Sequence, residues 1–424
     1  MSSVIKNAYL TILAAGGGVF MRHIKMFHAA LAALVTVLAG GYAQAEDAAV
    51  EDTPAADETP AVTKVKRLKP KYTSVMTVSG YTGESELENF PVAVRISTAN
   101  ILGFDYAKCD GEGDVTFTDN DGNILPHEIE VWNTEGESVA WVSIPKLSTV
   151  VAEDKTTYTT FKMHGGHETK LADTKSTEVW TASAYPTVWH MAQSDVVKDS
   201  STSSRNMTVS TSWSHGVETN NNSKIGVSFT ARASAANSAP AGVMSTGNIY
   251  LGYTGPDKSG AYRDCTLSGW MNIKGFTGTN GNPLGPYKKG STYYWSLYPY
   301  SSWSKLCLRF KSTSAEATVA NLAPKSAGWF HYAIKIDKSR NFSLYINGKN
   351  EGTSYKAAEG QIYYKGPLTL YLAGLPGYLD ETRIRDALSS DDWIKAEYDS
   401  INNKQFVVAS EAVKNGYGLK IIVR

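Results

Sequence analysis

One segment, residues 328–349, constrains the fold of this chain more than any other. It holds two alternating runs, at 329–336 and 342–347, separated by five polar residues. Successive side chains of a strand point to opposite faces, so every second residue of a run shares a face. The Asp/Ser/Asn-rich break favours a turn, and Asn347-Gly348 offers a second tight turn directly afterwards. The segment therefore predicts a β-hairpin with Phe330, Tyr332, Ile334 and Ile336 on one face.

Composition and charge favour a β-rich protein and argue against two classes of partner. Lys and Arg together number 41, and Asp and Glu together also number 41. This balance gives no support to a nucleic-acid partner or to a polybasic membrane surface. The chain has 24 Tyr and 36 Gly but only 19% charged residues. Such a composition is typical of short strands joined by turns.

The amino terminus has the pattern of an export signal. Basic residues within 21–25 precede an apolar run at 29–39, and Ala43-Gln44-Ala45 forms an A-x-A cleavage motif. We predict a signal peptide over residues 1–45, with 1–20 as an extra extension, and a mature chain that starts at Glu46. An uncleaved anchor built from two apolar runs is the alternative. The signal predicts a secreted, periplasmic or cell-surface protein with no membrane insertion after cleavage.

Changes in composition along the mature chain predict its domain organisation. Residues 46–70 are rich in Ala, Pro and charged residues with almost no large apolar side chain, which predicts a flexible linker. Residues 71–168 contain strand-like segments separated by turn signals and are expected to form a first β domain. A second set of such segments occupies 177–402. Residues 403–424 alternate again, which predicts strands that pack on the second unit or on the first.

Three cysteines remain in the mature chain: Cys109, Cys265 and Cys307. They are too few for a disulfide scaffold, and their spacing lacks the C-x-x-C pattern of a zinc or redox site. Cys265 and Cys307 lie in strand-like segments that could meet across neighbouring strands, or both are buried thiols.

The first unit carries a recognisable order of five short segments. They are NFPV at 89–92, DVTFTDNDG at 114–122, LPHEIEVW at 125–132, VAWVSIP at 139–145 and MHGG at 163–166. This order resembles a domain of unknown function that commonly precedes a laminin-G-like module in bacterial exported proteins. His164 stands where the pattern usually has an aromatic residue. The resemblance implies a small β domain and transfers no activity, because the role of that family is itself undefined.

Two carboxylates of the first unit invite a catalytic interpretation. Glu128 and Glu130 are two residues apart on a predicted strand, hence on one face with Trp132. Paired carboxylates beside an aromatic ring suit glycoside hydrolysis. We favour the alternative, a polar face of a half-buried strand that only meets solvent.

A second acidic segment has part of the spacing of a calcium-binding loop. Asp119, Asp121 and Asn123 alternate, and Glu130 falls where such a loop places its last carboxylate. Ile124 occupies the position of the required Gly, however, and no helices are expected on either side. An Asp-rich β-turn is therefore the favoured interpretation.

The second unit carries the motifs of a known fold. They are TVWHM at 187–191, DCTLSGWMNI at 264–273, the hairpin, LDETRIR at 379–385 and SDDWIKAEY at 390–398, where Ser389 or Ser390 can cap a short helix. These segments resemble laminin-G-like, concanavalin-A-like jelly rolls across most of 177–402. The resemblance implies an all-β chain, in which a small β-sandwich-like domain is followed by a concanavalin-A-like jelly-roll sandwich.

Catalysis by this jelly roll is not expected. Glycoside hydrolases with the fold that the resemblance implies place their acid and nucleophile on one strand as Glu-x-Asp-x-(x)-Glu, and no such string occurs in 177–424. Asp380 and Glu381 are adjacent, so strand geometry predicts that they point to opposite faces and cannot act as a pair. We therefore predict that the protein is not an enzyme.

Recognition is the function that the resemblance favours. Jelly rolls of this kind hold glycans or protein surfaces, and flat aromatic rings suit sugar rings. The candidate ligand-binding residues are Tyr287, Tyr294, Tyr298 and Trp303, although packing of alternate residues in the core is the favoured interpretation of such a run. A glycan partner is preferred. A structural or adhesion role through another surface protein is the alternative, and a glycoside hydrolase is the less favoured one.

The resemblance also implies a structural Ca²⁺ site. In similar jelly rolls the Asp that begins the final core strand often binds this ion together with backbone carbonyls, which would make Asp380 the main ligand and Asp199 a second carboxylate. The alternatives are that Asp380 pairs with Arg383 or accepts hydrogen bonds from backbone N–H groups.

Overall fold

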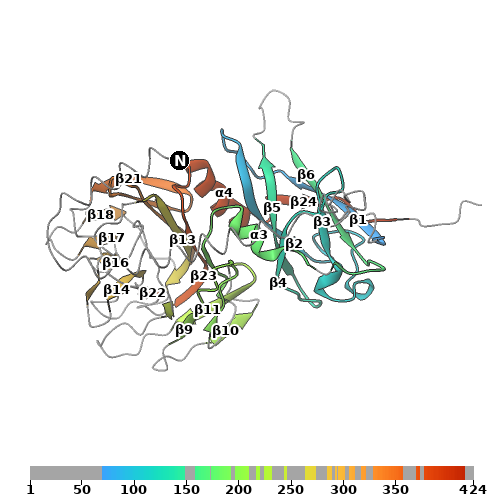
Figure 1. Cartoon of the computed structure of the whole chain (residues 1–424), viewed down its shortest axis with the longest axis horizontal. Coiled ribbons are helices and arrows are strands. Elements are labelled where there is room, and N and C mark those ends of the chain that lie inside the picture. The colour runs from blue at the N-terminus through green and yellow to red at the C-terminus, as the bar shows by residue number, and fades with distance from the viewer. Residues whose placement is uncertain are drawn as a thin grey trace, which may run out of the picture. The chain divides into compact units, whose positions relative to one another are not determined.

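A computed structural model describes residues 69–148, 158–171, 173–191, 196–209, 216–219, 224–231, 243–245, 263–273, 284–288, 292–293, 295–300, 305–310, 317–320, 328–356, 369–372 and 377–415. The predicted signal peptide at 1–45 and nearly all of the predicted linker at 46–70 lie outside these residues. Residues 62–424 form one compact unit, which holds all the described elements (Figure 1). None of the described helices is long and apolar enough to cross a membrane.

Two antiparallel sheets build the amino-terminal sandwich. In spatial order the first consists of β24 (Val407–Ala409), β1 (Tyr72–Val78), β6 (Thr159–Gly165) and β3 (Thr116–Thr118), with β25 (Val413–Lys414) also on β1. The second consists of β2 (Leu87–Ile96), β5 (Ser138–Leu147) and β4 (His127–Val131). Side chains of both sheets share one apolar core, including Met76, Phe161, Val92 and Val142.

Strand β2 is buried on both faces. Val92, Ala93 and Val94 are consecutive and at most 3% exposed, a pattern that needs cover on each side of the sheet. One cover is the opposite sheet, and the other is helix α4 (Asp391–Asn402), whose Trp393 meets Phe90 edge to face with 5.0 Å between ring centroids. The last helix of the chain therefore packs on one of its first strands.

The carboxy-terminal residues return to the amino-terminal sandwich. Strand β24 pairs with β1 from Met76–Ala409 to Val78–Val407, and Phe406 just before it is 1% exposed. Of the two alternatives open for 403–424, the structure shows pairing with the first unit for the described residues 407–409 and 413–414.

The jelly roll also consists of two antiparallel sheets. One runs β10 (Gly216–Thr219), β11 (Val227–Ala231), β23 (Gly377–Arg385), β13 (Cys265–Ile273), β19 (Trp329–Ile336), β20 (Asn341–Ile346) and β21 (Lys349–Lys356), with β7 (Thr187–Trp189) on β23. The other runs β18 (Ala317–Ala320), β17 (Lys305–Phe310), β16 (Trp295–Tyr300), β14 (Leu284–Lys288), β22 (Thr369–Leu372), β12 (Val243–Ser245), β9 (Met207–Val209) and β8 (Val196–Val197), with β15 (Thr292–Tyr293) on β14. The predicted all-β class is confirmed.

The predicted hairpin is β19 and β20, followed by a tight turn into β21. Tyr332, Ile334 and Ile336 are fully buried on one face, as the alternation predicts, and Phe330 is half-buried. Asn347 (φ 50°) and Gly348 (φ 77°) both adopt the left-handed conformation that a two-residue turn requires. His331 and Ala333 on the other face are also fully buried, and Ala333 packs with Ile394 of α4.

Helix α4 begins where a serine caps it. The Ser390 hydroxyl accepts a hydrogen bond from the backbone N–H of Trp393 at 3.1 Å, and Asp391 and Asp392 in the first turn favour the positive end of the helix dipole. Together with α3 (Ser176–Thr181), α4 lies where the strands of the sandwich meet those of the jelly roll (Figure 1).

Cys265 and Cys307 do not meet across neighbouring strands. Cys265 begins β13 and Cys307 lies in β17, and these strands belong to different sheets. The side chain of Cys307 lies outside the described residues.

Candidate functional site

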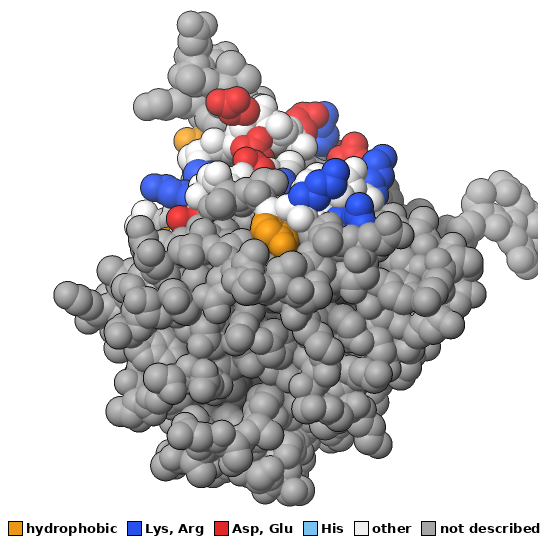
Figure 2. Space-filling view, turned by 90° about the vertical axis from the view of Figure 1, so that its left-hand side faces the viewer, with side chains coloured by type: hydrophobic (Ala, Val, Ile, Leu, Met, Phe, Trp, Pro, Cys, Tyr) orange, Lys and Arg blue, Asp and Glu red, His pale blue; other side chains and the backbone are white. Residues whose placement is uncertain are grey.

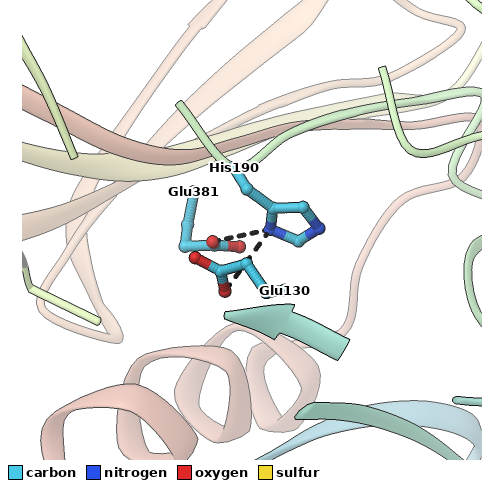
Figure 3. Close-up of side chains that lie close together, drawn as sticks. All are labelled: Glu130, His190 and Glu381. Carbon is cyan, nitrogen blue, oxygen red and sulfur yellow. Dashed lines mark hydrogen bonds and ion pairs between the residues drawn. The ribbon is translucent and has the colours of Figure 1, made fainter. Parts of the chain in front are cut away.

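Five charged side chains are buried where β4 and β5 of the sandwich meet β7 and β23 of the jelly roll. We call Glu128, Glu130, His190, Glu381 and Arg383 the junction cluster. Their side chains are 18%, 0%, 6%, 1% and 2% exposed, respectively. Figure 3 shows three of them, with the carboxylates of Glu130 and Glu381 turned toward one nitrogen of the His190 ring. Buried charges of this kind persist only when each has a partner.

His190 is the centre of the cluster. Its Nδ1–H donates to Glu381 Oε1 at 2.7 Å and lies 3.8 Å from Glu130 Oε2. On the opposite side of the ring, Nε2 lies 3.4 Å from Glu128 Oε2. The imidazole also stacks on Trp141, with 5.8 Å between ring centroids and 19° between planes. Three carboxylates from two parts of the fold thus converge on one imidazole.

The two glutamates of β4 are held by indole and hydroxyl groups. Trp180 Nε1–H donates to Glu128 Oε2 at 2.6 Å, and the Ser200 hydroxyl donates to Glu128 Oε1 at 2.7 Å. Trp141 Nε1–H donates to Glu130 Oε2 at 2.9 Å. The prediction that Glu128 and Glu130 only meet solvent is therefore wrong. Local alternation could not show that the jelly roll and α3 cover the outer face of this strand.

Arg383 balances the cluster from the side of β23. Its guanidinium donates to Glu381 Oε2 at 2.5 Å and lies 3.6 Å from Glu397 Oε1. The guanidinium carbon is 4.2 Å from the ring centroid of Trp141 and 4.9 Å from that of Trp180. Planar Arg suits such a position, because it stacks on indoles while donating to carboxylates at its edge.

An irregularity in β23 turns neighbouring acids toward the junction. The register between β13 and β23 shifts between Ser268 and Trp270, so one extra residue is accommodated on β23, and Glu381 there has φ 48°. Asp380 pairs with Trp270, while Glu381 reaches His190 and Arg383. The regular alternation behind the expectation that Asp380 and Glu381 point to opposite faces is interrupted at this register shift, and both carboxyls are buried.

Burial and charge act against each other on the pKa values of the cluster. Burial alone would lower the pKa of His190, but Glu381 and Glu128 outweigh it and raise this pKa well above its usual value. Burial alone would raise the pKa of Glu381 and of Glu128, and His190 prevails in lowering both. The result is a charged imidazolium between carboxylates.

Asp380 behaves differently from the other acids. Burial raises its pKa well above the usual range, and the charges of Glu381 and Glu130 add to this. Its Oδ2 accepts hydrogen bonds from the backbone N–H groups of Lys224 and Ile225, both at 3.0 Å, whereas Oδ1 has no hydrogen-bond partner. These backbone contacts are one of the two alternatives to Ca²⁺ ligation. In the other, Arg383 would pair with Asp380, but here it pairs with Glu381.

Asp199, the second predicted calcium ligand, organises its own loop. Its Oδ1 accepts from the backbone N–H groups of Val188 and Ser201, and its Oδ2 accepts from that of Arg205. The role of Asp199 and Asp380 in binding Ca²⁺ remains a prediction.

The four predicted ligand-binding aromatic side chains lie outside the part of the chain that the structure describes. Tyr287 lies in β14 and Tyr298 in β16, but their side chains are outside the described part of the structure. Tyr294 and Trp303 lie outside the described residues altogether. Their role remains a prediction.

The acidic segment at 119–123 forms a turn. Asp119 Oδ1 accepts from the backbone N–H of Asn123 at 2.8 Å, and Gly122 has φ 86°. This is the geometry of an Asp-rich turn, as favoured from the sequence.

Two residues of the junction cluster and one indole beside it were not predicted as site residues. His190, Arg383 and Trp180 lie in segments separated by up to two hundred positions, and each motif alone looked structural. The available signals were the Trp-His pair at 189–190, the Glu-x-Glu pair and the Glu-x-Arg pair at 381–383. Nothing in their spacing indicates that they meet.

A comparison with protein families found a match to part of the second half of the chain. Residues 246–395 match a laminin G family model described as "Concanavalin A-like lectin/glucanases superfamily". This stretch contains β13 to β23, the hairpin and the start of α4. The predicted laminin-G-like, concanavalin-A-like module is thus confirmed over these residues. The resemblance of 86–166 to a domain of unknown function remains a prediction.

Solved structures with some likeness come from toxins and a sialidase. The binding domain of Paraclostridial Mosquitocidal Protein 1 is 14% identical with a TM-score of 0.37, and 52% of each chain is covered. The binding domain of botulinum neurotoxin serotype D/C is 17% identical with a TM-score of 0.38, over 52% of this chain and 53% of that one. Trypanosoma rangeli sialidase is 10% identical with a TM-score of 0.38, over 68% of this chain and 44% of that one.

The chain spans about half the length of these solved chains or less. Likeness at this level carries no statement about their ligands. A search of curated proteins found no match to the sequence.

Proposed function

We propose that the protein is a non-catalytic recognition module whose laminin-G-like jelly roll binds glycan outside the cytoplasm. One observation carries the proposal: residues 246–395 match a superfamily described by its lectins and glucanases. All four aromatic residues predicted to stack on sugars, from Tyr287 to Trp303, lie inside this stretch. Export through the predicted signal peptide would bring the module to extracellular glycans.

The described residues give less support to a glucanase activity than to a lectin-like role. Hydrolysis needs two carboxyl groups, about 5 to 9.5 Å apart, that the sugar can reach. The carboxylates that converge in the described residues are those of the junction cluster, and Glu130 and Glu381 are 0% and 1% exposed. Each is tied to an indole, an imidazolium or a guanidinium, so neither is placed to protonate or attack a glycosidic bond.

Charge on the described surface agrees with a neutral ligand. In Figure 2, Lys and Arg side chains lie among Asp and Glu side chains on the described part of the face, and neither sign prevails there. The whole chain likewise has equal numbers of both. A mixed surface does not favour polyanions, whose recognition depends on clustered positive charge.

A glycan array probed with the purified full chain, with and without EDTA, tests the proposal. We expect binding to a narrow set of glycans and its loss in Tyr287→Ala and Tyr298→Ala variants that melt at the wild-type temperature. Equal binding by the variants would refute the assignment of these residues. Release of reducing sugar from a bound polysaccharide would contradict the non-catalytic role. Binding to an exported surface protein without any glycan would favour the adhesion alternative.

A further inference from the structure

The junction cluster brings three possible metal-ligand atoms close together. Ligand atoms of Glu130, His190 and Glu381 all lie within 4.8 Å of one another, and all three side chains are buried (Figure 3). Two ligands of a tetrahedral zinc ion with bonds of ~2.0 Å lie ~3.3 Å apart. The distances from His190 Nδ1 to Glu381 and Glu130, 2.7 and 3.8 Å, bracket that value.

Each of these three groups already has an outer partner that fixes its orientation. Glu128 lies on the far nitrogen of His190, Trp141 donates to Glu130, and Arg383 donates to Glu381. Metal-binding imidazoles are commonly oriented by a carboxylate on their other nitrogen, and metal-binding carboxylates are themselves hydrogen-bonded. The arrangement matches that pattern at all three positions.

A buried carboxyl oxygen without a partner belongs to the residue before Glu381. Asp380 is 0% exposed, and its Oδ1 has no hydrogen-bond partner. Its other oxygen accepts from the N–H of Ile225, and the next residue, Gly226, lies so close to Glu130 that a Cβ there would be 1.9 Å from Oε1. The carboxyls of Asp380 and Glu130 therefore flank the same two residues. Buried polar atoms without partners are rare and call for an explanation such as an ion.

We propose that the junction cluster binds one divalent transition-metal ion of the zinc type, with His190 Nδ1, Glu130 and Glu381 as ligands. One imidazole with carboxylates suits such an ion, whereas Ca²⁺ prefers six to eight oxygen ligands. Binding releases the Nδ1 proton of His190 to solvent, and the dication together with Arg383 then balances the carboxylates of Glu128, Glu130 and Glu381. The three ligand side chains are at most 6% exposed, so a substrate does not reach the ion and its role is to fasten β4 of the sandwich to β23 of the jelly roll.

Zinc uptake by the full chain tests this site independently of glycan binding. Protein stripped with a chelator and dialysed is titrated with Zn²⁺, followed by metal analysis and by the melting temperature. We expect about one zinc per folded chain and a melting temperature that rises with zinc concentration, because the ion binds only the folded state. Glu130→Gln should abolish both effects. Glu178→Gln on the exposed surface of α3 makes the same chemical change and should retain them.

A second variant keeps the test decisive if Glu130→Gln does not fold. Trp141→Phe retains a ring against His190 but removes the N–H that orients Glu130, so we expect zinc affinity to fall about 10- to 100-fold. Co²⁺ in place of zinc should give the visible absorption of a four-coordinate site in wild type. Folded wild type that binds no zinc, wild-type affinity in either junction variant, or stabilisation by Ca²⁺ but not Zn²⁺ would overturn the proposal.

Discussion

At the scale of single residues, Arg383 supplies positive charge that stabilises the buried acids of the junction. It lies between Glu381 and Glu397 and under two indole rings, and it is 1% exposed. Burial raises the pKa of Glu397, and the nearby guanidinium only partly offsets this. Removing one member of a buried ion pair leaves the other charge without compensation, which costs more than the pair itself contributes.

Replacing Arg383 by Met should therefore lower the free energy of unfolding by about 3 to 5 kcal/mol. Arg385→Met is the matched control. Arg385 is half-buried, donates to the Ser183 carbonyl and stacks on Trp393, and its loss should cost about 1 to 2 kcal/mol. Denaturant unfolding of both variants measures the difference. Equal losses in the free energy of unfolding would mean that Arg383 in the junction cluster contributes no more to stability than the half-buried Arg385.

His331 is a second residue with a measurable signature. It is 0% exposed, and neither ring nitrogen has a hydrogen-bond partner. Burial lowers its pKa to about 3, with Arg383 adding to the effect. Although Nε2 lies 4.0 Å from Glu397 Oε2, the two do not form an ion pair, because the imidazole is neutral and burial raises the pKa of Glu397.

This pKa predicts a loss of stability in mild acid. Between pH 6.5 and about 3 the unfolded chain binds a proton on His331 that the folded chain does not, so stability falls as the pH falls. One such proton changes the free energy of unfolding by about 1.4 kcal/mol per pH unit. His331→Phe should reduce the slope of stability between pH 6.5 and 4.5 by this amount. An unchanged slope in chemical denaturation at these pH values would show that His331 is protonated in the fold.

At the scale of elements, the hairpin was predictable and the junction was not. Tyr332, Ile334 and Ile336 follow a period of two within eight residues, and Asn347-Gly348 specifies its own turn. Glu128 and Glu130 follow the same local rule, yet what covers them comes from residues about 60 and 250 positions away. A local alternation predicts which residues share one face of a strand. It does not record which distant element will bury that face.

The turn after β20 also packs against α4. Comparing two glycines of positive φ separates the cost of backbone strain from the cost of disturbing that contact with the helix. Gly348 and Gly352 both have positive φ, 77° and 71°. A Cβ on Gly352 would meet nothing within 4 Å, whereas one on Gly348 would lie 3.2 Å from Lys395 Cα and 3.3 Å from Tyr398 Cβ in α4. Gly352→Ala should cost about 1 kcal/mol through backbone strain alone, and Gly348→Ala about 2 to 4 kcal/mol because it also presses on the helix. Thermal melts of the two variants would refute this if Gly352→Ala were the more damaging.

At the scale of the whole molecule, the chain closes on itself rather than forming two successive modules. The first strand, β1, pairs with β24 and β25, which follow the jelly roll in sequence. Helix α4 packs on β2, and the junction cluster joins β4 to β23. Composition and motifs predict two units, but contacts between residues hundreds of positions apart join the described elements of both in one compact unit. The amino-terminal sandwich is therefore incomplete without the carboxy-terminal residues.

A truncated chain tests this closure. Ending the chain at Asn402 removes Phe406, whose carbonyl accepts from Ser79 and Gly80, and exposes the edge of β1 along Met76–Val78. Loss of one large buried aromatic side chain alone costs about 3 to 5 kcal/mol. We expect hydrogen exchange to speed up in β1 and β6 while β19 and β20 stay protected. A chain ending at Asn415 keeps every described strand pair and is the control. If the shorter chain protects β1 as well as the control does, the amino-terminal sandwich does not depend on the returning strands.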